Sequence, residues 1–239
     1  MDSRVSLACL LACCAPLAAQ PANELLRRVA EHYQSITEYR LEAKGLTQSE
    51  LPGRISPAIE TRFILASSGA GRIYFEARHN LQVLLVADGH NVWTWDSESR
   101  RQRKEPLNPG PDGIPKRLAD SVSFLFGRFR LLGSPNLRTQ VLGEEDLLIE
   151  GQKVRCTIVA VAPPPPDAGR WSDRLWIDPQ SLLVRKSIFY EVTSLTPEPT
   201  SQVRTLVWTV LSTGQPLPPS LFVFTPPGTK RRRSVTIPP

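Results

Sequence analysis

The sequence predicts an α+β protein in which a strongly curved antiparallel sheet is covered by an N-terminal helix and an internal helix. We expect an incomplete barrel of about ten or eleven strands. From residue 39 onward, the chain contains short segments in which apolar and polar residues alternate, and turn residues separate these segments. Two other segments carry apolar residues at helical spacing. The chain of 239 residues is long enough for one sizeable core, so we expect a single domain over residues 20–239.

Residues 1–19 have the pattern of a secretory signal peptide. Arg4 precedes an apolar run over residues 5–17, and small residues then lead to a polar segment. We therefore expect an exported protein that is cleaved after Ala19. A lipoprotein processing site at Cys13, which would be acylated, is the alternative.

Cysteine and histidine placement predicts neither a disulfide nor a metal site. Cys156 is the only cysteine after the leader, and apolar Val154 and Ile158 on the same strand face predict that it is a small buried residue. A reactive thiol is the alternative. The histidines lack the paired spacing that a metal needs, and we expect no cofactor. They are His32, His79 and His90.

The first helix is predicted just after the leader, where Asn23 can cap it. Its apolar face is formed at helical spacing, and charged residues occupy the other face. The apolar residues are Leu25, Leu26, Val29, Ala30, Tyr33 and Ile36. A helix of this kind must lie against an apolar surface.

The stretch Leu81–Asp96 constrains the sheet most. An apolar run breaks at Asp88-Gly89 and resumes with Val92, Trp93 and Trp95, which is typical of a hairpin of two well-buried strands. Alternating runs come before and after it, so we expect this hairpin to be the central wall of the sheet. Trp93 and Trp95 are two residues apart and therefore share one face.

A second helix is predicted after the turn-rich segment 106–115, with Pro115 in its first turn. Its apolar stripe consists of Leu118, Val122, Leu125, Phe129 and Leu132. An ordinary core helix is one interpretation. A lid over a cavity, with the Pro- and Gly-rich flanks as hinges, is the other. Further strands are expected between residues 137 and 211, and the run Leu221–Phe224 is counted as the last.

Four segments, in this order, resemble the LolA-like periplasmic lipoprotein carriers. They are the first helix leading into a strand at Tyr39, the Ala87–Asp96 element, Leu175-Trp176-Ile177-Asp178-Pro179, and the closing run from Phe222 to Gly228. The resemblance covers nearly the whole mature chain. It implies a periplasmic protein with an incomplete barrel whose apolar concave side holds acyl chains. The family's cargo-gripping Arg-Pro pair has no counterpart, since Arg72 is not followed by proline.

The sequence favours a non-enzymatic carrier of lipoprotein or lipid acyl chains. Nucleophile elbows, phosphate loops and glycine fingerprints are absent from the sequence. An envelope sensor or protein-interaction module with the same fold is the alternative. The candidate ligand-binding residues are Phe75, Trp93, Trp95, Leu118, Val122, Leu125 and Phe129. Plain core packing is the competing interpretation for each of them.

The formal net charge of +6 and two basic clusters suggest a partner. Because an exported protein rarely meets nucleic acid, we expect an anionic membrane surface or an acidic protein instead. Solvated surface charge is the alternative, and we expect a monomer. The clusters are Arg100, Arg101, Arg103 and Lys104, and Lys230, Arg231, Arg232 and Arg233.

Overall fold

The computed structural model describes residues 21–51, 53–69, 71–108, 116–167, 169–193 and 200–227. The expected leader, the acylation alternative at Cys13, Pro115 and the cluster at residues 230–233 lie outside these ranges.

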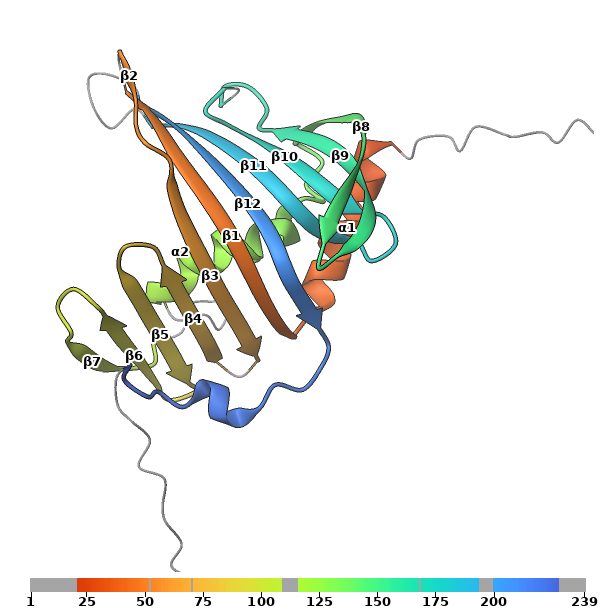
Figure 1. Cartoon of the computed structure of the whole chain (residues 1–239). Coiled ribbons are helices and arrows are strands. Elements are labelled where there is room, and N and C mark those ends of the chain that lie inside the picture. The colour runs from red at the N-terminus through yellow and green to blue at the C-terminus, as the bar shows by residue number, and fades with distance from the viewer. Residues whose placement is uncertain are drawn as a thin grey trace, which may run out of the picture.

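One antiparallel sheet of twelve strands forms the body of the protein, in the order β7-β6-β5-β4-β3-β1-β12-β11-β10-β9-β8, with β2 paired to β1 (Figure 1). The strands are β1 (Glu38–Leu51), β2 (Arg54–Ile55), β3 (Ile59–Ser68), β4 (Arg72–Arg78), β5 (Gln82–Asp88), β6 (Asn91–Asp96), β7 (Gln102–Pro106), β8 (Arg138–Ile149), β9 (Gln152–Ala162), β10 (Trp171–Asp178), β11 (Leu183–Thr193) and β12 (Thr200–Thr213). The helices are α1 (Ala22–Ser35) and α2 (Lys116–Leu125), with short 3-10 helices η1 (Gly127–Leu131) and η2 (Pro219–Phe222).

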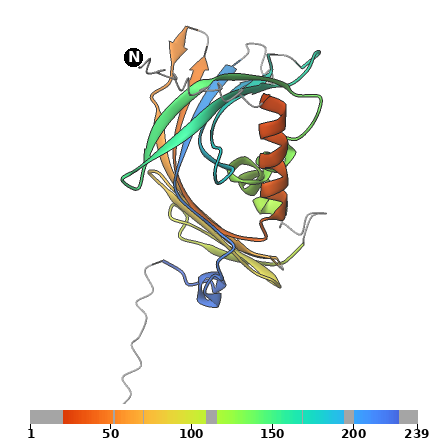
Figure 2. The ribbon, with the colours of Figure 1, turned by 90° about the vertical axis from the view of Figure 1, so that its right-hand side faces the viewer.

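The sheet is strongly curved but not closed, because β7 and β8 remain its two edges. Both α-helices lie inside the curve, and η2 lies on the outside, below β4 and β5 (Figure 2). The predicted fold class is therefore confirmed: an open, curved antiparallel sheet covered by an N-terminal and an internal helix. The sheet has twelve strands rather than ten or eleven, the two-residue β2 among them.

The first and last strands meet in the middle of the sheet. β1 pairs with β12 from Tyr39–Thr213 to Glu50–Ser201, with one register shift between Glu42 and Ala43. The hairpin β5–β6 consequently lies next to the β7 edge, and the expectation that it forms the central wall was wrong. Neighbours in sequence predict hairpins well, but the pairing of two distant strands leaves no local pattern.

The hairpin itself forms as predicted. Gly89 has a φ of 96°, a left-handed conformation that favours glycine, and the Asp88 carboxylate accepts hydrogen bonds from the backbone N–H groups of His90 and Asn91. These contacts fix the turn between β5 and β6.

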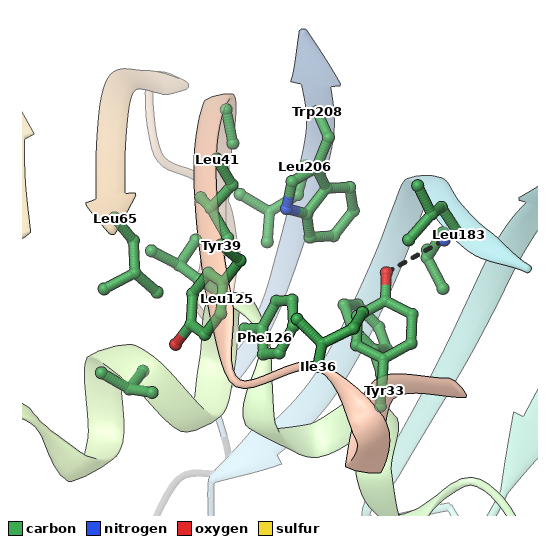
Figure 3. Packing of buried hydrophobic residues seen from close by; sticks show 14 of the residues in the cluster. Tyr33, Ile36, Tyr39, Leu41, Leu65, Leu125, Phe126, Leu183, Leu206 and Trp208 are labelled. Carbon is green, nitrogen blue, oxygen red and sulfur yellow. Dashed lines mark hydrogen bonds between the residues drawn. The ribbon is translucent and has the colours of Figure 1, made fainter. Parts of the chain in front are cut away.

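The core lies between the concave face and the helices. Tyr39 and Leu41 of β1, Leu206 and Trp208 of β12 and Leu65 of β3 face α2 and the start of η1 (Figure 3). The ring of Phe126 stacks on Tyr39 with centroids 3.8 Å apart, and Phe129 meets Trp208 edge-on at 5.4 Å. Apolar residues of α1 fill the rest of this layer. They are Leu25, Leu26, Val29, Ala30 and Tyr33.

Three local expectations needed correction. Asn23 does not cap α1; the helix begins at Ala22 after Pro21, and the Asn23 side chain accepts a hydrogen bond from Thr139 instead. The second helix ends at Leu125 and continues as the 3-10 helix η1. The run 221–224 forms no strand: the prolines on both sides of it lack the N–H that a ladder needs, and Phe222 is buried at the end of η2.

Leu41 and Leu46 lie on opposite faces of β1 and provide a matched test of which face carries the core. Leu41 is fully buried, whereas Leu46 is 46% exposed. Leu41→Ala is expected to lower the free energy of unfolding by about 2–5 kcal/mol, because it leaves a cavity. Leu46→Ala should change it by about 0.5 kcal/mol or less. Equal losses in urea titrations would contradict the assignment of the two faces.

Candidate functional site on the concave face

The concave face has two parts that differ in exposure. On β1, Tyr39, Leu41 and Ala43 lie under the helices and are buried. Further along the strand the same face becomes half-exposed at Thr47, whose cross-strand partner Ile59 is 55% exposed. The inner wall of the sheet therefore extends beyond the helices that cover it.

Gly45 marks the boundary between the two parts. A Cβ atom at this position would lie only 2.7 Å from the ring of Phe63 and 3.2 Å from Leu206. The absence of a side chain allows these two residues of the neighbouring strands to close over β1.

Arg128 joins the helical cover to the sheet at this boundary. It lies in η1 and donates hydrogen bonds to the Asp173 carboxylate of β10 at 2.6 Å and to the Ser187 hydroxyl of β11 at 2.7 Å. Its guanidinium also lies about 5 Å from the rings of Phe129 and Phe189. All three polar groups come from separate elements, so this contact ties η1 to both strands.

The Arg128–Asp173 pair is poorly solvated. Burial raises the pKa of Asp173 to about 7, although the positive charge of Arg128 acts in the opposite direction. Burial likewise lowers the pKa of Arg128. The two pKa values move in opposite directions but for the same reason: burial disfavours the charged form of each side chain by more than the attraction between the two charges favours it. Two buried atoms of the pair, Arg128 Nε and Asp173 Oδ1, have no hydrogen-bond partner.

The half-exposed part of the face continues from this pair with aromatic and charged side chains. Phe124 of α2 lies beside the guanidinium groups of both Arg128 and Arg204. Arg204 is 3.6 Å from the Glu191 carboxylate, and Trp171 stacks on Phe189. An apolar layer with a charged rim suits an amphiphilic ligand, whose chain and headgroup need different surroundings.

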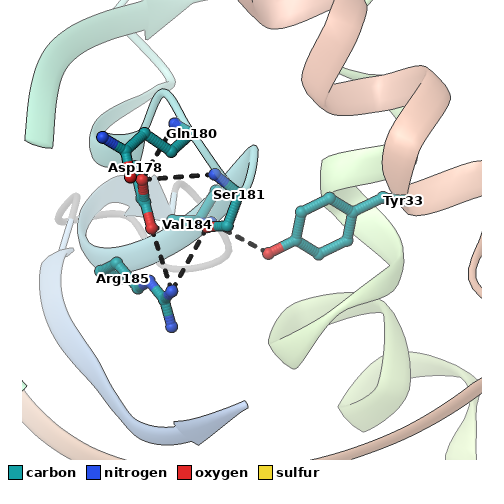
Figure 4. Close-up of polar contacts among 6 residues, drawn as sticks. All are labelled: Tyr33, Asp178, Gln180, Ser181, Val184 and Arg185. Carbon is teal, nitrogen blue, oxygen red and sulfur yellow. Dashed lines mark hydrogen bonds and ion pairs between the residues drawn. The ribbon is translucent and has the colours of Figure 1, made fainter. Parts of the chain in front are cut away.

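α1 is held both to η1 and to the sheet. Arg130 of η1 donates hydrogen bonds to the carbonyl oxygens of Tyr33 and Ile36. The Tyr33 hydroxyl accepts a hydrogen bond from the Val184 N–H at the start of β11 (Figure 4). The preceding turn is held by Asp178, which accepts hydrogen bonds from the N–H groups of Gln180 and Ser181 and from the guanidinium of Arg185. The C-terminal end of α1 also runs directly into β1, and at the N-terminal end Asn23 accepts a hydrogen bond from Thr139 of β8.

Five of the seven predicted ligand-binding residues come together in the core cluster. They are Phe75, Leu118, Val122, Leu125 and Phe129, all buried. Phe75 belongs to the concave wall, and the other four to α2 and η1.

Trp93 and Trp95 lie on the opposite, convex face, so the expected lining needs correction. Phe75 pairs with Leu85, which pairs with Thr94, whereas Trp93 is opposite Val86. The two tryptophans do share a face, as predicted, but Trp93 stacks on Phe224, with ring centroids 5.2 Å apart. The C-terminal segment thus covers this outer surface.

Other predicted positions have simpler environments. Cys156 is buried, as predicted, and burial raises the pKa of its thiol to about 11, which disfavours the reactive thiolate. Arg100, Arg101 and Arg103 are exposed around the β6–β7 turn, and Lys104 lies over the ring of Trp93. Within the described ranges, no three His, Cys, Asp or Glu residues gather as a metal site would require. No helix of that part is long and apolar enough to cross a membrane.

Sequence reasoning missed Arg128 and Asp173, which lie 45 residues apart. The one feature of the sequence that could have pointed to this pair was Arg128 itself, a charged residue directly before Phe129 of the apolar stripe. Nothing in the local pattern of β10 singles out Asp173.

Comparisons with known proteins find likeness only among solved structures. No protein-family model matches the chain, and no curated protein sequence matches it. A LolA superfamily protein from Nitrosomonas europaea has a TM-score of 0.31 at 11% identity, over 85% of this chain and 97% of the other. A putative outer membrane lipoprotein-sorting protein domain from Vibrio parahaemolyticus has a TM-score of 0.32 at 11% identity, over 84% and 95%.

MucB from Pseudomonas aeruginosa, solved in complex with MucA, has a TM-score of 0.39 at 17% identity. The match covers 84% of this chain but only 60% of that one. LolA superfamily and lipoprotein-sorting proteins are thus among the solved structures to which this chain is similar. At these identities and TM-scores the likeness carries no activity, ligand or partner over to this chain.

The raised pKa of Asp173 predicts a pH dependence of stability. Between its ordinary value of 3.8 and about 7, the folded protein keeps a proton on Asp173 that the unfolded chain has lost. The contribution of this carboxyl to stability is thus present at low pH and is lost as the pH rises through about 7. Asp173→Asn should remove this dependence in urea titrations across that range. Asp167→Asn, at an exposed aspartate, should retain it; an unchanged profile in Asp173→Asn would contradict the assignment.

Proposed function

We propose that this protein is an exported, non-enzymatic carrier that binds acyl chains of lipoproteins or related lipids on its concave face. The observation that supports the proposal is the apolar layer between the sheet and α2–η1, which runs into the aromatic, charged part of the same face. Each CH₂ group removed from water contributes about 0.8 kcal/mol. An acyl chain that replaced α2–η1 against this wall would keep the wall covered.

The segment that moves in this proposal is α2–η1. α1 is tied to β11 through Tyr33 and continues into β1, so it stays with the sheet. η1 is held to the strands by Arg128, whose pair with Asp173 is weakened by burial and unpartnered atoms. Phe124 and Arg128, which border the half-exposed part of the face, are placed to contact an entering ligand first.

Uptake of a fluorescent long-chain fatty acid by delipidated protein tests the carrier. We expect saturable uptake, reduced by unlabelled long-chain fatty acid but little by a short-chain one, since affinity grows with each buried CH₂. Arg128→Met should speed uptake because it releases η1 from Asp173 and Ser187. Arg155→Met, which removes two exposed ion pairs between β9 and β8, serves as the control. Absence of saturable uptake by the unaltered protein would sink the proposal.

A protein-interaction module is the second candidate. It is favoured because the protein's own side chains fill the space between the sheet and the helices; Phe126 and Trp208, for example, are almost fully buried there. A face filled in this way leaves the exposed surfaces, including the basic β6–β7 turn, as the places where a partner would bind.

Native mass spectrometry of the protein from its own host separates the two candidates. A carrier is expected to retain a lipid mass that disappears after delipidation. An interaction module should show the bare protein mass or a defined protein complex. The intact mass also reports whether the chain is cleaved after Ala19 or acylated at Cys13.

A further inference from the structure

Three cations lie directly opposite one another on the convex face. Lys44 of β1 pairs with Arg62 of β3, and Arg62 pairs with Arg78 of β4. Side chains at such positions have Cβ atoms about 5 Å apart, and like charges there repel. The row is therefore electrostatically unfavourable by itself.

The neighbouring carboxylates only partly offset this charge. Glu76 is buried and accepts hydrogen bonds from Tyr74, Gln82 and Arg78. Glu42 lies on the same face and is paired with Arg40.

Two cations of the row remain weakly paired. Arg62 lies 3.9 Å from Glu60, and both side chains are mostly exposed, so water screens their attraction. Lys44 has no hydrogen-bond or ion-pair partner among the residues that the structure describes. Its ammonium group is thus available to an anion.

The row borders a cavity of about 240 Å³ on the outer surface. Lys44, Arg62 and Arg78 line it together with Ile64, Thr209 and the carboxylates Glu42 and Glu76. Both carboxylates already have a cationic partner, Arg40 for Glu42 and Arg78 for Glu76. A cavity of this size holds a small group and leaves the cations accessible from solvent. An anion bound there would relieve the repulsion along the row.

We propose that this cavity binds a phosphate group. The terminal phosphate of a monoester presents three free oxygens, enough to meet the three cations at once, whereas a planar carboxylate presents two. The exposed side chain of Leu46 lies two residues beyond Lys44 on the same face. A phospholipid bound through its phosphate would place the apolar part of the lipid next to this leucine, whereas a soluble phosphate would occupy the cavity alone. The site is on the opposite face from the proposed acyl site and does not depend on it.

Binding is tested with inorganic phosphate by calorimetry, and with phosphatidylcholine vesicles with or without phosphatidic acid, a phosphate monoester, by co-sedimentation, at constant ionic strength. Lys44→Gln and Arg62→Gln should each weaken binding about tenfold, the loss of one charge-assisted hydrogen bond. Without phosphate, Lys44→Gln should raise the unfolding temperature slightly, because one repulsion is removed. Arg100→Gln and Arg101→Gln, which remove the same charge from an exposed turn, serve as controls.

The outcomes separate the sources of the phosphate. Binding of inorganic phosphate that depends on Lys44 and Arg62 supports a soluble ligand, and vesicle binding with the same dependence supports a lipid headgroup. Equal losses in the control variants would show a general charge effect and overturn the proposal. So would the absence of saturable binding in both assays.

Discussion

The structure depends on one constraint: the inner face of a strongly curved sheet is too apolar to be left in water. On β1 and β12 the buried residues Leu41, Leu206 and Trp208 form the floor of this face, and the aromatic residues of α2 and η1 close over them. The helices exist as helices largely because this surface needs a cover. Where the cover ends, at Gly45, the face changes to half-exposed aromatic and charged residues. The boundary between the two parts is set by how far two short helices reach along long strands.

Much of the fold could be predicted because alternation and helical spacing report burial directly. The hairpin at Asp88-Gly89, the amphipathic first helix and the buried stripe from Leu118 to Phe129 were all visible in the sequence. The sequence did not reveal on which face of the sheet Trp93 lies. β5 has buried residues on both faces, Leu85 toward the helices and Leu84 and Val86 on the outer side, and Phe224 stacks on Trp93 of β6 on that outer side. When both faces are apolar, alternation shows which residues share a face but not which face it is.

The candidate site was harder to predict than the fold, for a related reason. Arg128, Asp173 and Ser187 meet only because η1, β10 and β11 are brought together in space. Lys44, Arg62 and Arg78 form a row only in the register of three strands. Such groups have no fixed spacing along the chain, so a sequence motif cannot reveal them. The same register that places the apolar residues inside places these charges opposite one another outside.

The pairing of β1 with β12 has a consequence for the order of events during folding. Every other neighbouring pair along the sheet, apart from the β1–β3 contact that skips β2, joins strands that are consecutive in the chain, so those pairs can form locally as hairpins. The seam between β1 and β12 must wait until the last strand has been synthesised. Until then, β1 has β3 on one side and a long unpaired edge on the other, which is open to pairing with other chains. The nascent protein is thus most prone to aggregate shortly before its synthesis is complete, and its two half-sheets become one molecule in a single late step.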